Sequence, residues 1–112
     1  MSSEPAEARL RALRSETEAE VRAADESIDA MTAARADANT DDEHDPEGAT
    51  IGFEWSQADA LRGALRRRLA QVDAALERVA DGTYGFCAIC GDPIAPARLE
   101  ARPTADRCIR HA

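Results

Sequence analysis

Two closely spaced pairs of metal-binding residue types constrain this chain more than any other feature. Cys87 and Cys90 are separated by two residues, 17 residues follow Cys90, and Cys108 and His111 are again separated by two residues. Two ligand pairs joined by a short loop are a common way for a small segment to surround a tetrahedral Zn2+. Because protein residues would fill all four positions, the spacing predicts a closed, structural site with one zinc ion.

The charges around this predicted site bear on how stable it would be. Three thiolates and one neutral imidazole would leave a bound Zn2+ with a net charge of about −1. Arg107 and Arg110 flank the last ligand pair, so we expect them to help stabilise the thiolates. The alternative is three unliganded thiols beside a chance histidine.

Cysteines in metal spacing with none left over favour a reducing compartment, which indicates a cytoplasmic protein.

Composition limits the core that the chain can build. It has 112 residues, and aromatic residues make up only 4% of them. We therefore expect one small domain with an extension, stabilised by a metal. The sequence contains no apolar run long enough for a transmembrane helix and does not begin like a signal peptide, so no membrane association is expected.

The net charge of −8 is unevenly distributed along the chain. Residues 1–80 hold 18 acidic and 10 basic side chains, whereas residues 81–112 hold four of each. An acidic arm opposes binding to nucleic acid, which requires basic surface, so no direct DNA binding is expected. It favours a basic partner surface or a cation.

The rest of the chain predicts two long helices. Apolar and small residues recur at steps of three and four over residues 4–38 and again over residues 51–80, whereas residues 39–50 carry turn signals. The predicted fold is therefore mainly α: a long antiparallel coiled-coil hairpin over residues 1–80 and a small C-terminal zinc finger over residues 81–112. The predicted seam positions are Leu10, Leu13, Thr17, Val21, Ala24, Ile28, Met31, Ile51, Trp55, Ala58, Leu61, Leu65, Leu69, Val72, Leu76 and Val79.

The loop between the predicted helices is strongly acidic. The segment from Thr50 to Ala80 has 31 residues, so as a helix it spans roughly 46 Å. The loop is therefore expected far from the cysteines, at the tip of the hairpin. It could be a solvated turn, a docking element for basic residues or for a Mg2+ ion held by a partner, or a pair of carboxylates that themselves hold a Mg2+ and activate water. The candidate partner-binding residues are Asp41, Asp42, Glu43, Asp45 and Glu47.

The C-terminal segment resembles the zinc finger of the DksA/TraR family. The resemblance rests on the run GTYGFCAICG from Gly82 to Gly91, on Ile94, on the run RLEARPTA from Arg98 to Ala105, and on Cys108. The preceding arm is similar to the coiled-coil hairpin of that family. The run DDEHDPEGATIGFEWSQ at residues 41–57 resembles actinobacterial members in particular.

This resemblance implies a nonenzymatic transcription regulator that binds bacterial RNA polymerase. In the family, the coiled coil enters the secondary channel and its tip approaches the active site, and several members act with the alarmone guanosine tetraphosphate. His111 stands where the family usually has a fourth cysteine. At positions linked to the alarmone, Arg102 matches, whereas Gln71 stands where a lysine is expected. In the tip, Asp45 matches the first family aspartate, whereas Gly48 stands where the second is expected and Thr50 replaces an alanine.

Two other functions agree with the same residues. The thiolates could release zinc on oxidation, which would make the chain a zinc- or redox-responsive protein-binding switch. The acidic tip could instead assist Mg2+-dependent transcript cleavage. A zinc deaminase is not indicated, because the H-x-E sequence that accompanies its P-C-x-x-C motif is absent.

Overall fold

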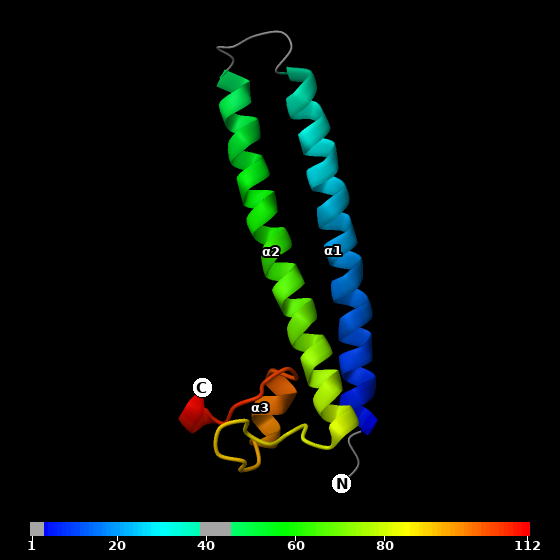
Figure 1. Ribbon diagram of the computed structural model, residues 1–112, viewed down its shortest axis with the longest axis vertical. Helices are drawn as coiled ribbons and strands as arrows, with labels where there is room; N and C mark the ends of the chain where they lie inside the picture. Colours follow the sequence, from blue (N-terminus) through cyan, green and yellow to red (C-terminus); the bar gives the residue numbers. More distant parts are fainter. Residues whose placement is uncertain (1–3, 39–45) are drawn as a thin grey trace. The chain divides into compact units, whose positions relative to one another are not determined.

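The computed structural model describes residues 4–38 and 46–112, which are mainly helical (Figure 1). Helix α1 runs over Glu4–Ala38 and helix α2 over Pro46–Asp81, and the two pack as a hairpin. A short helix α3, Pro96–Ala101, and a 3-10 turn η1, Ile109–His111, follow in the cysteine-containing segment. The predicted fold class is confirmed.

Helix α2 begins earlier than the sequence predicts. Its first residue is Pro46, five residues before the predicted start at residue 51, so residues 46–50 are helical and do not belong to the loop. Proline fits the first helical turn because its ring fixes φ near the helical value and its missing N–H is not needed there. Gly48 disfavours helix by about 1 kcal/mol and Thr50 by somewhat less, but the periodic segment that follows lets the helix extend back to the proline.

Helix α2 ends at Asp81 and is followed by a glycine cap. Gly82 has φ +82°, a conformation that side chains with a Cβ rarely adopt. This turn lets the amides of Thr83 and Tyr84 donate to the carbonyl of Arg78 at 2.9 and 3.1 Å. The cap satisfies carbonyls at the end of α2 and directs the chain into the cysteine segment.

The chain divides into two compact units, Met1–Glu16 with Arg68–Ala112, and Thr17–Arg67. The cysteine segment therefore shares a unit with the adjoining ends of both long helices. The division into a hairpin over residues 1–80 and a finger over residues 81–112 stays a prediction.

The unit that contains the cysteines has an apolar seam between its two helix ends. Leu10 of α1 and Val72 and Ala75 of α2 are completely buried. Beside this seam, Arg14 Nε lies 2.6 Å from Asp73 Oδ1. The three buried residues form the apolar part of this end of the hairpin, and the ion pair lies at its side.

The other unit, Thr17–Arg67, has a more polar seam. Thr17 and Ile28 are buried, and Trp55 Nε1 donates to Thr32 Oγ1 at 3.1 Å. The prediction that Leu61 lies at the seam is wrong, because this residue is 58% exposed. Arg62, seven residues after Trp55, takes the inward position instead.

Arg62 belongs to a cluster of ion pairs across the seam. Its guanidinium lies 2.6 Å from Asp59 Oδ1 and 3.7 Å from Asp25 Oδ1, and its side chain is only 24% exposed. Arg66 lies 2.9 Å from the same Asp25 oxygen, so this carboxylate of α1 pairs with two arginines of α2. The polar cluster, defined as Asp25, Asp59, Arg62 and Arg66, interrupts the apolar seam of this unit.

Candidate metal centre

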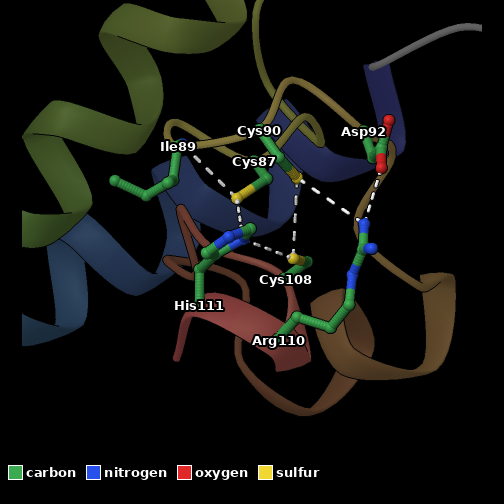
Figure 2. A network of polar contacts seen from close by, with 7 residues as sticks. All are labelled: Cys87, Ile89, Cys90, Asp92, Cys108, Arg110 and His111. Carbon is green, nitrogen blue, oxygen red and sulfur yellow. Dashed lines mark hydrogen bonds and ion pairs between the residues drawn. The ribbon is translucent and has the colours of Figure 1, made fainter.

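The structure brings all four predicted metal ligands together (Figure 2). One ligand atom from each of Cys87, Cys90, Cys108 and His111 lies within 4.8 Å of the others. His111 Nδ1 lies 3.2 Å from Cys108 Sγ and 3.7 Å from Cys87 Sγ. Cys90 Sγ lies 3.8 Å from Cys108 Sγ.

These distances fit the edges of a zinc tetrahedron. Zn–S bonds of about 2.3 Å and Zn–N bonds of about 2.0 Å give edges of about 3.8 Å between two sulfurs and about 3.5 Å between sulfur and nitrogen. A disulfide would require sulfurs about 2.05 Å apart, and all three cysteines are free. Three thiolates and one imidazole nitrogen form a complete donor set for Zn2+, so the residues fit a closed structural site.

The first ligand pair lies in a tight turn that depends on a glycine. Gly91 has φ +76°, and its amide donates to the Cys87 carbonyl at 2.9 Å. The same turn directs the amide of Ile89 at Cys87 Sγ, 3.4 Å away. A thiolate that accepts a backbone N–H is stabilised and fixed in direction, so this turn helps to orient the first ligand pair.

The second ligand pair lies at η1, and backbone hydrogen bonds join it to the first pair. The amide of His111 donates to the Cys108 carbonyl at 3.0 Å, which places both side chains on one side of the turn. The amide of Ala88 donates to the Asp106 carbonyl at 2.8 Å and connects the two ligand segments. An isolated antiparallel bridge between Phe86 and Pro93 closes the loop that carries the first pair.

The thiol pKa values follow from this network. Burial raises the pKa of Cys87, but hydrogen bonds from the backbone of Cys108, Cys90 and Ile89 outweigh it and lower the pKa to about 5. At Cys108 burial also opposes ionisation, and the hydrogen bond with His111 is the main cause of a lowered pKa. Both buried thiols are therefore prepared to act as thiolates, which is the form that binds metal.

Cys90 differs from the two buried cysteines. A backbone hydrogen bond from Asp92 lowers the pKa of Cys90. Partial desolvation of the sulfur and the neighbouring thiols of Cys87 and Cys108 outweigh that effect and raise the pKa. Its side chain is exposed, whereas those of Cys87 and Cys108 are buried.

The two arginines that flank the last ligand pair behave differently. Arg110 Nη2 lies 2.6 Å from Asp92 Oδ2 and 3.9 Å from Cys90 Sγ, so its predicted role beside a thiolate is supported. For Arg107, the interaction that the structure gives is through its backbone, whose carbonyl accepts a hydrogen bond from Arg98 Nε at 2.9 Å.

The ligands also form much of the local core. Cys87, Ile94 and Cys108 are buried together, and Leu99 of α3 packs against them. Four side chains bury too little apolar surface to hold such a segment by themselves. A bound metal would therefore be a structural part of this core.

The two positions that the family resemblance links to the alarmone line the same pocket. Gln71 of α2 and Arg102, directly after α3, both border a cavity of about 270 Å³. Arg78, Arg98 and Arg107 also line it, together with Asp106, so arginines outnumber acidic side chains in its wall.

The predicted tip lies largely outside the described residues. Asp41, Asp42, Glu43 and Asp45 fall there, and Glu47 lies in the first turn of α2 without a described side chain. Within residues 4–38 and 46–112, no helix combines the length and apolar character needed to cross a membrane.

Several supporting residues could not be identified from the sequence. Tyr84 OH donates to the Pro103 carbonyl at 2.8 Å, and Arg78 reaches the Thr104 carbonyl at 3.3 Å. The Arg9 side chain of α1 donates to the Glu100 carbonyl. The sequence offers no signal for these contacts beyond a tyrosine between Gly82 and Gly85, since backbone acceptors carry no residue signature.

The fold and the site define a helical-hairpin protein that ends in a small zinc finger. Residues 82–110 match the family model for the prokaryotic DksA/TraR C4-type zinc finger. This match and the four clustered ligand atoms support one structural zinc, as predicted.

Relatives extend the similarity beyond the finger. The RNA polymerase-binding transcription factor DksA of Caulobacter vibrioides is 54% identical over 48 residues, covering 43% of this chain and 34% of that protein. DksA of Escherichia coli K12 is 44% identical over 48 residues, covering 43% and 32%. The chain thus spans about a third of the length of these relatives.

A solved structure matches nearly the whole chain. Transcription factor DksA2 from Pseudomonas aeruginosa superposes with a TM-score of 0.81 at 26% identity, covering 97% of this chain and 78% of that one. The C-terminal segment therefore matches the zinc finger of the DksA/TraR family, and the chain as a whole is similar in fold to a DksA2 protein. The assignment of the chain to the actinobacterial members stays a prediction.

Proposed function

We propose that this chain is a cytoplasmic, nonenzymatic transcription regulator that binds bacterial RNA polymerase. In this proposal the acidic connection between α1 and α2 enters the secondary channel, and the zinc finger stabilises the base of the hairpin. The main support is the match of almost the entire chain to a DksA2 transcription factor. The names of the sequence relatives, which state that they bind RNA polymerase, add to it.

The physical properties of the chain agree with this role. Residues 1–80 carry an excess of acidic side chains, and residues 41–47 concentrate five of them with no lysine or arginine between them. Such a segment is attracted to a basic channel or to a Mg2+ ion and is repelled by nucleic acid phosphates. Recognition through protein contacts is therefore favoured over direct DNA binding.

A binding experiment with purified core polymerase tests the proposal. We expect the tagged full chain to retain the enzyme and a triple variant of Asp42, Glu43 and Asp45 to Ala to lose most of it. The matched control replaces three exposed glutamates of α1 by Ala, which changes the net charge equally; these are Glu16, Glu20 and Glu26. If the wild-type chain does not retain polymerase, the proposal is wrong. Equal losses in both variants would refute the role of the tip.

A further inference from the structure

We propose that Arg110 and Asp92 form a clasp that slows the loss of zinc from the metal centre. The inference rests on the assignment of the four ligands to one Zn2+. Arg110 lies in η1 between the ligands Cys108 and His111, and Asp92 lies two residues after Cys90. Figure 2 shows the Arg110 side chain extending from the second ligand segment towards both Asp92 and the sulfur of Cys90.

The clasp joins the two segments that carry the ligand pairs. Asp92 is fixed in the first segment, because its carbonyl accepts the amide of Cys87 at 2.8 Å. Arg110 belongs to the second segment and reaches Asp92 Oδ2 at 2.6 Å. Zinc leaves a four-ligand site only after ligand atoms separate, so a contact that holds the two segments together opposes this opening.

The clasp also contacts the most exposed of the three cysteine ligands. Cys87 and Cys108 are buried, whereas Cys90 is exposed and open to a competing chelator or to protons. The guanidinium of Arg110 lies 3.9 Å from this sulfur, the range of a weak charge-assisted contact to a thiolate. The cation thereby partly balances the negative charge of the site at its exposed corner.

The Arg110–Asp92 contact should affect zinc binding more than folding stability. The Arg110 and Asp92 side chains are 66% and 61% exposed, and an ion pair so exposed adds little to folding stability by itself. Residues that hydrogen-bond to metal ligands, by contrast, typically change metal affinity by about 10- to 100-fold. The clasp should therefore act on zinc release much more than on the overall stability of the helices.

The test measures zinc release from the full chain after mixing with excess EDTA, with zinc content followed by native mass spectrometry. We expect Arg110→Gln to release zinc about tenfold faster than wild type, at the lower end of the range for such partners. Asp92→Asn should also accelerate release. The double variant should release zinc no faster than Arg110→Gln alone, because a single substitution already opens the clasp.

Arg107→Gln is the matched control, since it removes the same charge from the other side of Cys108. We expect its release rate to stay within about twofold of wild type, because Arg107 does not hydrogen-bond to a ligand sulfur in the described structure. An unchanged rate in Arg110→Gln, or equal acceleration in Arg107→Gln, would overturn the clasp.

Two further outcomes keep the inference separate from the zinc assignment. Wild-type protein isolated without zinc would refute the metal centre itself, whereas one zinc per chain with unchanged release in Arg110→Gln refutes only the clasp. If Arg110→Gln loses its zinc during purification, Arg110→Lys replaces it, because lysine keeps the charge but cannot contact Asp92 and Cys90 together. Release from Arg110→Lys at the wild-type rate would contradict the clasp.

Discussion

His111 Nδ1 lies 3.2 Å from Cys108 Sγ, so the imidazole faces the other ligands through this nitrogen. We expect His111→Ala to reduce zinc affinity by more than the roughly 100-fold that loss of a ligand's hydrogen-bond partner can cost. His111→Cys should retain one zinc, because it restores the four-cysteine set of the family model. Competition with a chromogenic chelator measures both affinities. Unchanged affinity in His111→Ala would exclude the histidine as a ligand.

Removal of zinc should unfold the finger and leave most of the helical signal. The finger core consists largely of the ligands, and structural zinc sites contribute about 10–16 kcal/mol of binding energy that is also folding energy. Helices α1 and α2 contain 35 and 36 residues, whereas α3 contains 6, so far-UV circular dichroism should fall only slightly. Amide exchange in residues 83–112 should accelerate strongly. Full protection of these amides in the zinc-free protein would contradict this account.

Arg62→Leu should stabilise the hairpin. Burying a leucine side chain is worth about 1.5–3 kcal/mol, whereas a partly exposed ion pair contributes about 0–1 kcal/mol, so we expect a net gain of about 1 kcal/mol. Arg66 remains as a partner for Asp25. Chemical denaturation of the zinc-bound protein measures the change, with Arg67→Leu on the exposed face as the control. A loss of stability in Arg62→Leu would show that the polar cluster stabilises the seam.

Gln71→Lys should strengthen binding of guanosine tetraphosphate to the complex of this chain with polymerase. The substitution adds a cation to a pocket that Arg102 and three other arginines already line, and a tetraphosphate-bearing nucleotide carries several negative charges. Equilibrium binding of labelled alarmone to the complex measures the effect, with Arg102→Gln expected to weaken it. Equal affinity in wild type and Gln71→Lys would place the nucleotide elsewhere.

The sequence predicts features that depend on residue type at fixed spacing. Cys87 and Cys90 indicate a metal site because so few residue types bind zinc, and Gly82 indicates a helix end because glycine tolerates positive φ. The fold follows from the apolar periodicity of the two long segments. Each of these patterns can be recognised along one continuous segment of the sequence.

Features that depend on residues far apart in the chain could not be predicted. Steps of three and four allow either Leu61 or Arg62 at the seam, and apolar character favours the wrong one, because the partners of Arg62 become apparent only after folding. Asp92 and Arg110 are 18 residues apart and meet only once the ligand segments close. The early start of α2 depends on a balance between Pro46 and weak helix formers, which local propensity does not settle.

Site-directed cross-linking from the tip tests the central claim most directly. A photoreactive p-benzoylphenylalanine replaces His44, which lies among the acidic residues between α1 and α2. After irradiation of the complex with core polymerase, mass spectrometry identifies the attached peptides. The account predicts cross-links to segments that line the secondary channel near the catalytic Mg2+. Cross-links confined to the outer surface of the enzyme, or none from a chain that binds polymerase, would contradict it.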